Sequence, residues 1–241
     1  QPASNQWLRL MARNFTPHTQ IVLGYSGYER GKGWLHKRIS FNTLFTSLRY
    51  LGFALAGKPY MGLGRNLAYR KELFFKQKGY STHLNLQRGE DDLFINQIAN
   101  TENTRVETNA RAIMRMQPIE RYKDWKEERV SYMATARYYK GAQRYLLGFE
   151  TCSRLLFYVA CIASIVFGII HSHWLVAGIA FFIWLLRYTV QAIVINKTAT
   201  DQEENRHYSF SLLLFDLLQP LQTLQLKLYR LYRGKGDFMR R

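Results

Sequence analysis

The feature that most constrains this chain is a run of 32 residues, from Leu155 to Leu186, without any Asp, Glu, Lys or Arg. One helical crossing of a bilayer needs about 20 apolar residues, so the run is long enough for more than one crossing. The sequence His171-Ser172-His173 separates two hydrophobic segments, Leu155–Ile170 and Trp174–Val194, and the second continues past the end of the charge-free run. We therefore expect a helical hairpin in a membrane, with Leu146–Arg154 extending its first helix.

The charge of the chain points to the same partner. The sequence has 34 Lys and Arg residues against 17 Asp and Glu, a formal net charge of +17. Such a surplus suits an anionic membrane surface or a nucleic acid. The charge-free run favours the membrane, and no nucleic-acid-binding motif is present, so we expect no nucleic acid as a partner. Basic residues flank both outer ends of the hairpin, which predicts that both ends are cytoplasmic. Arg187, near the end of the run, has to pair or reach the interface.

The residues before the hairpin read as mixed α/β. Short apolar runs predict strands, and apolar residues at spacings of three and four predict helices. The expected strands are Thr19–Tyr25, Pro59–Leu63 and Arg111–Met116, and the expected helices are Trp34–Ala56, Leu93–Ala99 and Tyr122–Tyr139. The helix Trp34–Ala56 is amphipathic with basic flanks, so it suits a membrane interface or a place on the domain core equally.

The residues after the hairpin alternate between polar and apolar character. We read Thr200–His207 as a polar linker. Phe210–Leu218 is too short to span a membrane unless Pro220–Leu228 continues it, so an interfacial or partly inserted helix is expected. From Lys227 to Arg241 the chain mixes aromatic and basic residues. We interpret this tail as a basic anchor beside the membrane, with an RNA-binding tail as the alternative.

Two motifs are candidates for chemistry. Gly62-Leu63-Gly64-Arg65-Asn66 lacks the third glycine of a nucleotide fingerprint, but its glycines would let the backbone approach a substrate. Gly89-Glu90-Asp91-Asp92-Leu93-Phe94 holds three adjacent carboxylates. Their mutual repulsion can raise a pKa into the range of a general base, and carboxylates also bind hard metals such as Mg²⁺. The alternative is an exposed helix start, where acidic residues are favoured.

The order of these features resembles a known family. GLGRNLAYR, then GEDDLF, then a helix with a spaced Arg, then membrane helices, is similar to bacterial membrane-bound family 2 glycosyltransferases with the GT-A fold. The resemblance covers essentially the whole chain. It implies the C-terminal portion of a GT-A domain at 1–145, a transmembrane hairpin at 146–196, and an interfacial helix with a basic tail at 197–241. It also implies the inner membrane of a bacterium, with the catalytic part in the cytoplasm.

The resemblance implies roles for particular residues. Asp91 would be the general base of an inverting transfer, with Glu90 and Asp92 in support. The stretch Lys126–Val130 corresponds to the family's QxxRW motif: Arg129 matches, while Lys126 replaces the Gln and Val130 replaces the Trp. The missing Trp argues against a processive, cellulose-synthase-like mode. The implied substrate-binding residues are Gly62, Gly64, Arg65, Asn66, Lys126 and Arg129.

The resemblance also implies partners and a cofactor. The family's DxD motif, which holds a metal and the nucleotide sugar, is expected upstream of Gln1, so no metal ligands are expected in this chain. The full-length enzyme would use a divalent cation, Mg²⁺ or Mn²⁺, a nucleotide-sugar donor, a glycan or lipid-linked acceptor, and a lipid bilayer. This fragment alone would be inactive because it lacks the donor-binding half. The alternative from another class is a non-catalytic membrane protein whose basic surface binds lipid or a partner.

Overall fold

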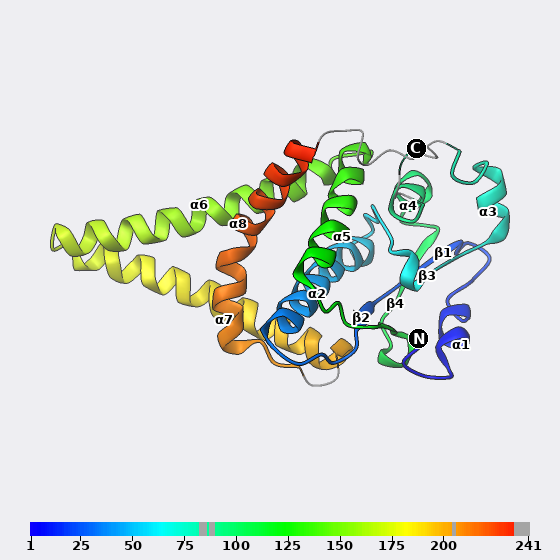
Figure 1. Ribbon diagram of the computed structural model, residues 1–241, viewed down its shortest axis with the longest axis horizontal. Helices are drawn as coiled ribbons and strands as arrows, with labels where there is room; N and C mark the ends of the chain where they lie inside the picture. The colour runs from blue at the N-terminus through cyan, green and yellow to red at the C-terminus, as the bar shows by residue number, and fades with distance from the viewer. Residues whose placement is uncertain (82–85, 87–89, 204–205, 234–241) are drawn as a thin grey trace. The chain divides into compact units, whose positions relative to one another are not determined.

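The structure is a computed structural model that describes residues 1–81, 86, 90–203 and 206–233 (Figure 1). The described chain is mostly helical with small sheets, so α and β elements are both present, and the GT-A topology stays a prediction. The chain divides into two compact units, one of residues 1–144 with 226–241 and one of residues 145–225. Gly89 of the acidic motif and the end of the basic tail lie outside the described residues.

The first unit is built around short strands. β1 (Ile21–Gly24) lies between β3 (Leu67–Tyr69), which is antiparallel to it, and β4 (Thr104–Glu107), which is parallel. β2 (Ser26–Tyr28) pairs in parallel with β5 (Met114–Met116). The apolar residues of β1 are buried on both faces of the sheet, as expected for a central strand. β1 therefore forms the middle of this core.

Helices of different lengths surround these strands. They are α1 (Trp7–Ala12), α2 (Trp34–Leu55), η1 (Gly64–Asn66), α3 (Lys71–Lys76), α4 (Asp92–Ile98), η2 (Ala110–Ala112), α5 (Tyr122–Thr135) and η3 (Ala136–Tyr138). α2 contacts β2 and β4 and buries Phe41, Leu44 and Tyr50. The Tyr50 hydroxyl donates to the Gly24 carbonyl at 2.9 Å. One face of this amphipathic helix thus packs on the core.

Two strand predictions need correction. Pro59–Leu63 is not a strand: Tyr60, Met61 and Leu63 are buried without a strand partner, and the paired segment is β3, which begins at Leu67. Proline has no N–H for a ladder, and the Tyr60 carbonyl accepts from the Asn96 side chain at 2.7 Å instead. Within Arg111–Met116 only Met114–Met116 is a strand, because the Asn109 side chain accepts from the Arg111 N–H and holds a 3₁₀ turn before it.

The second unit contains long helices. α6 runs from Gln143 to Ile170, α7 from Trp174 to Glu203 and α8 from Ser209 to Arg233, with the residues of α8 from Leu226 onward belonging to the first unit. Among the described residues, α6 and α7 are the two helices long and apolar enough to cross a membrane. They meet closely at their turn, where a Cβ on Gly168 would lie 2.9 Å from the Ala177 backbone nitrogen. The extension of the first hydrophobic helix through Leu146–Arg154 is confirmed.

Two predictions at this end of the chain change. Thr200–His207 is not a linker throughout, because α7 continues to Glu203. Ile195 and Ala199 are buried and extend the packed face of the helix beyond the apolar run. The segments Phe210–Leu218 and Pro220–Leu228 form one helix, α8, with Pro220 inside it. A proline costs a helix at least one hydrogen bond, so the packing of the flanking turns has to compensate.

Candidate functional site

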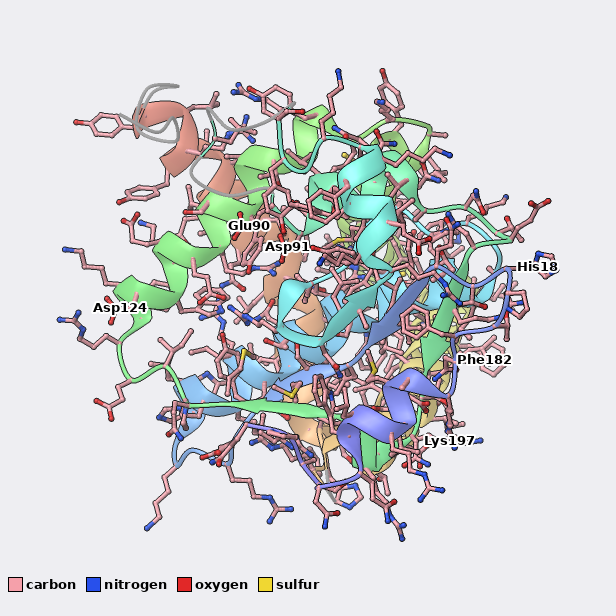
Figure 2. The ribbon with its side chains drawn as sticks, turned by 90° about the vertical axis from the view of Figure 1, so that its right-hand side faces the viewer. His18, Glu90, Asp91, Asp124, Phe182 and Lys197 are labelled. Carbon is pink, nitrogen blue, oxygen red and sulfur yellow. The ribbon has the colours of Figure 1, made fainter. Side chains whose placement is uncertain are left out.

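The acidic motif begins helix α4, and Asp91 caps it. Asp91 Oδ1 accepts from the Asp92 N–H at 2.8 Å, and Asp91 Oδ2 accepts from the Gly64 N–H at 2.7 Å. The first N–H groups of a helix have no partner within it, so a carboxylate at the cap is favoured there. Asp91 is half-buried, and Figure 2 shows it beside Glu90. Two backbone amides from separate segments therefore fix the direction of a partly exposed carboxylate.

The other two carboxylates of the motif have different surroundings. Glu90 is exposed, whereas Asp92 is fully buried. Asp92 Oδ2 accepts from the hydroxyl of Tyr139 at 2.7 Å and from the hydroxyl of Thr135. Burial raises the pKa of Asp92 to about 6, against the lowering effect of the Thr135 hydroxyl and with a further contribution from Asp91. Asp92 therefore ties the start of α4 to the end of α5 and to η3, and it is closed to a substrate.

The buried state of Asp92 predicts a pH dependence of stability. The pKa of about 6 in the folded protein exceeds the ordinary value of 3.8, so the folded state holds the proton more tightly. The contribution of Asp92 to the free energy of unfolding should be largest below pH 4 and fall as the pH rises through 6, by a loss on the order of 3 kcal/mol. Asp92→Asn should flatten this slope, whereas Glu90→Gln should keep it. Unfolding in detergent at pH 4 to 7.5 measures both, and an unchanged slope in Asp92→Asn would contradict the assignment.

The two glycines of the loop serve close packing. A Cβ on Gly62 would lie 2.9 Å from Leu23 Cδ2, and one on Gly64 would lie 3.3 Å from the Asp91 Cβ. A contact under 3.0 Å forces a neighbour to move, so Gly62 lets the loop reach β1. Gly64 lets its N–H reach the carboxylate of Asp91. In this structure the backbone of the glycine loop therefore lies close to the protein's own side chains, Leu23 and Asp91.

Asn66, a predicted substrate-binding residue, is buried at the end of this loop. Its Nδ2 donates to the Tyr25 carbonyl at 2.6 Å and to the Ala112 carbonyl at 2.8 Å, and its Oδ1 accepts from Trp7 Nε1 at 3.0 Å. Both amide hydrogens are used inside the protein. Asn66 holds the loop against β1, η2 and α1, and this leaves Arg65 as the projecting side chain.

Arg65 lies in a cluster of aromatic and charged side chains from β2 and α5. Its guanidinium forms an ion pair with Glu128 and donates to the Tyr28 hydroxyl at 3.4 Å. It also lies over the rings of Tyr28 and Tyr132, about 6 Å from each ring centre, within the range of a cation–π contact. The cluster is half-buried, so these charges are only partly screened by water. Arg65 is next in sequence to Gly64, which binds Asp91.

Arg129 belongs to the same cluster and is incompletely satisfied. Its Nη1 donates to Thr46 Oγ1 at 3.3 Å, while its Nε is buried with no hydrogen-bond partner in the described part of the chain. Burial lowers the pKa of the Arg129 guanidinium, Glu128 opposes this, and the charge of Arg65 adds to the lowering. Two guanidiniums therefore share one neighbouring carboxylate. An orphaned buried donor next to surplus positive charge suits an anionic ligand.

The rest of the matched motif faces elsewhere. Lys126 Nζ lies 3.4 Å from the centre of the Tyr229 ring, and Glu127 accepts from the Tyr229 hydroxyl at 2.9 Å. Val130, at the position of the family's Trp, is fully buried with Ala134 and Leu226. Lys126 is thus occupied by the last turns of α8, whereas Arg129 faces Arg65. The structure joins Asp91 to Gly64 and groups the next residue, Arg65, with Glu128 and Arg129, while Lys126 lies apart.

Sequence reasoning missed the partners of these residues. Tyr28 gave no signal, and Glu128 was passed over as the neighbour of Arg129. Thr135, which binds Asp92, also went unnoticed, although it lies between Tyr132 and Tyr139 within the helix expected at Tyr122–Tyr139. A carboxylate directly before a functional Arg on a helix is a signal that could have drawn attention to Glu128.

Among the described residues, no group of three or more His, Cys, Asp or Glu side chains is placed to hold a metal ion. The divalent cation that the family resemblance implies stays an expectation for the full-length protein. A comparison of this chain with protein-family models, curated proteins and solved structures finds no match. The family resemblance of the motifs is therefore a hypothesis, and the function has to be inferred from the site itself.

Proposed function

We propose that the protein is an inverting glycosyltransferase that moves a sugar from a nucleotide-sugar donor to a glycan or lipid-linked acceptor at a membrane surface. One observation carries the proposal. A partly exposed carboxylate, Asp91, is oriented by two backbone amides and is joined through Gly64 to a cluster of two guanidiniums, Arg65 and Arg129. When a hydroxyl displaces a nucleoside diphosphate, the reaction needs a base for the hydroxyl proton and, close to it, a site for the anionic leaving group.

Asp91 would act as the general base. An acceptor hydroxyl is a poor nucleophile at neutral pH, and a positioned carboxylate that takes its proton accelerates the attack. Each oxygen of Asp91 accepts one amide hydrogen, which fixes the carboxylate plane and leaves further lone pairs for the acceptor. Attack by the acceptor oxygen on the anomeric carbon forms the new glycosidic bond, and the bond to the diphosphate breaks on the opposite face. The configuration therefore inverts.

The cluster of Arg65 and Arg129 would bind the diphosphate. The leaving group gains negative charge as the glycosidic bond to it breaks, and guanidinium forks stabilise such charge with paired hydrogen bonds. Arg129 has a buried N–H to offer, and Arg65 has a counterion, Glu128, that a phosphate would displace. The divalent cation that the resemblance implies would supply further positive charge for the leaving diphosphate.

The two apolar helices would anchor the enzyme to the membrane in which its acceptor lies. α6 and α7 are candidate spans by length and composition, and the basic residues at their outer ends favour a cytoplasmic position for both ends. The proposal therefore locates the enzyme in the inner membrane of a bacterium with its catalytic part in the cytoplasm, where nucleotide sugars are made. A lipid-linked or growing glycan acceptor would be within reach there.

The proposal is tested by a donor screen. Membranes containing the full-length protein are incubated with a panel of nucleotide sugars and a membrane glycolipid extract, and released nucleoside diphosphate is measured. We expect release from one donor, with the sugar transferred to the extract. Absence of both release and nucleotide binding across the panel would contradict the proposal and favour a non-catalytic, lipid- or partner-binding membrane protein.

The ion pair between Glu128 and Arg65 makes a further prediction. The Glu128 carboxylate competes with a phosphate for the same guanidinium, so Glu128→Gln should tighten the binding of a nucleoside diphosphate by up to about fivefold, which corresponds to the roughly 1 kcal/mol of a partly exposed ion pair. Glu127→Gln is the matched control, because that carboxylate binds Tyr229. Titration calorimetry on the full-length protein measures both. Equal affinity for nucleoside diphosphate in Glu128→Gln and Glu127→Gln would show that Glu128 does not compete with the diphosphate for Arg65.

A further inference from the structure

The part of α8 within the second unit buries polar residues and exposes apolar ones. Its buried side includes Ser211, Asp216 and Gln222 beside the apolar Leu212 and Phe215. Its exposed side carries apolar residues at spacings of three and four: Phe210, Leu214, Leu217, Leu221 and Leu224. A helix on a water-soluble domain turns its apolar stripe inward and its polar face to solvent. Here hydrocarbon, and not water, is the solvent that suits the outer face.

The polar side of α8 forms a charged network with the two long helices. Asp216 is almost fully buried and accepts from Arg154 on α6 and Arg187 on α7, each at 2.9 Å. The Tyr158 hydroxyl also donates to Asp216, and Arg154 pairs with Glu150 as well. Arg187, which the sequence required to pair or reach the interface, is therefore paired. Charges in a low-dielectric environment persist when they face the interior and pair with one another.

The outer surfaces of α6 and α7 are apolar in the same way. Only 11% of each candidate span is buried in the structure, and Leu156, Val159, Ile162 and Phe182 are among its exposed residues. α8 crosses these two helices at a steep angle and does not run alongside them (Figure 1). If the hairpin stands upright in a bilayer, the first part of α8 lies in the plane of that bilayer.

We propose that Ser209–Gln225 is immersed in the hydrocarbon of the bilayer, with its leucine face on the acyl chains and Asp216 bound to the hairpin. The spacing along the helices supports this depth. Arg154 and Arg187 lie about 13 to 16 residues from the turn, or about 20–24 Å at 1.5 Å per residue. With the turn at the far edge of a hydrocarbon core of about 30 Å, the network lies about 6–10 Å below the near edge. In-plane amphipathic helices reach this depth.

A second copy of the chain is the competing occupant of the leucine face. The spacing of three and four also fits a coiled coil, but the positions that flank the stripe lack the charges that set partner choice in coiled coils. Ser211, Leu213, Leu218 and Gln225 occupy these positions. The stripe is also one part of an apolar exterior that includes α6 and α7. These features favour lipid. The inference does not depend on the glycosyltransferase proposal, since its readout involves no sugar transfer.

The test is nitroxide accessibility in the full-length protein, reconstituted in bilayers after Cys152→Ala and Cys161→Ala. Labels at Leu214→Cys, Leu217→Cys and Leu221→Cys should be relaxed strongly by oxygen and weakly by a water-soluble nickel chelate, at a depth of about 6–10 Å below the near edge of the hydrocarbon core. The control is Leu8→Cys, a leucine on α1 that is 67% exposed, where the nickel chelate should dominate. Nickel-dominated relaxation along the α8 stripe would overturn the proposal, and so would spin–spin broadening that reports a second copy.

The network itself is tested by one variant and its rescue. Asp216→Leu removes the carboxylate that Arg154 and Arg187 share, so Arg187 loses its acidic partner and Arg154 keeps Glu150. The leucine face should then move toward water, and nickel accessibility at Leu221→Cys should rise severalfold. The triple variant Asp216→Leu, Arg154→Leu and Arg187→Leu, made together with Glu150→Gln because Glu150 pairs with Arg154, removes the charges of the network. Buried ion pairs can often be replaced by apolar residues in this way. It should restore the lipid exposure. If the triple variant stays water-exposed while folded, the apolar face is not what holds α8 in the membrane.

Discussion

Replacing Asp91 with Asn is expected to lower sugar transfer by about 10² to 10⁴-fold, the usual contribution of a general base. Asn keeps the size and polarity of the side chain but cannot take a proton from the acceptor hydroxyl. It also has one acceptor oxygen where Asp91 uses two, one for Gly64 and one for Asp92. Donor affinity therefore has to be measured with transfer, in membranes containing the full-length protein, and we expect it to stay largely intact.

The neighbouring carboxylates and a capping variant complete this experiment. Asp91→Ser retains an oxygen that can cap α4, so it should fold well and still be inactive. Glu90→Gln should have a mild effect because Glu90 is exposed. Asp92→Asn should change stability and its pH dependence more than transfer, since Asp92 is buried among hydroxyls. Near-normal transfer in both Asp91 variants would show that the acidic motif is a helix start alone.

Sequence patterns located the helices well because helix periodicity is local. The helices expected at Trp34–Ala56, Leu93–Ala99 and Tyr122–Tyr139 correspond to α2, α4 and α5 with η3. The apolar runs likewise correspond to α6 and α7. Strands were harder to predict, since a buried apolar run such as Pro59–Leu63 looks the same whether or not a neighbouring strand pairs with it. The pairing partner of a strand is not a local property of the chain.

In the candidate site, too, the residue types are read from a short stretch of sequence, whereas their surroundings depend on residues far along the chain. The three adjacent carboxylates are indistinguishable in the sequence, yet Glu90 is exposed, Asp91 caps a helix and Asp92 is buried. What separates them comes from far along the chain: Gly64 donates to Asp91, and Thr135 donates to Asp92. The pairing of Asp216 with both hairpin arginines was invisible for the same reason. The order of motifs in the sequence indicates which residues are candidates, but the exposure and hydrogen-bond partners of each depend on tertiary packing.

Replacing Arg129 with Ala is expected to lower transfer by about 10- to 150-fold. This range corresponds to the loss of a hydrogen bond to a charged group, about 1.5–3 kcal/mol. The buried Nε of Arg129 has no partner among the described residues, so a diphosphate oxygen would satisfy it. Arg129→Lys should restore only part of the rate, because an ammonium group offers a point charge in place of a planar fork. The binding of nucleoside diphosphate to each variant should weaken in parallel with the rate.

Lys126→Ala is the matched control for Arg129, since both cations lie on α5 within the same stretch of motif. Lys126 lies over the Tyr229 ring and away from Arg65, so its loss should leave transfer within about twofold of wild type and affect stability by about 0.5–1 kcal/mol at most. If the two alanine variants lose transfer equally, the cluster of Arg65 and Arg129 is not the diphosphate site. If Arg129→Ala unfolds more readily but binds diphosphate normally, Arg129 serves the packing of α5 against Thr46 and α2, and the anion has to be bound elsewhere.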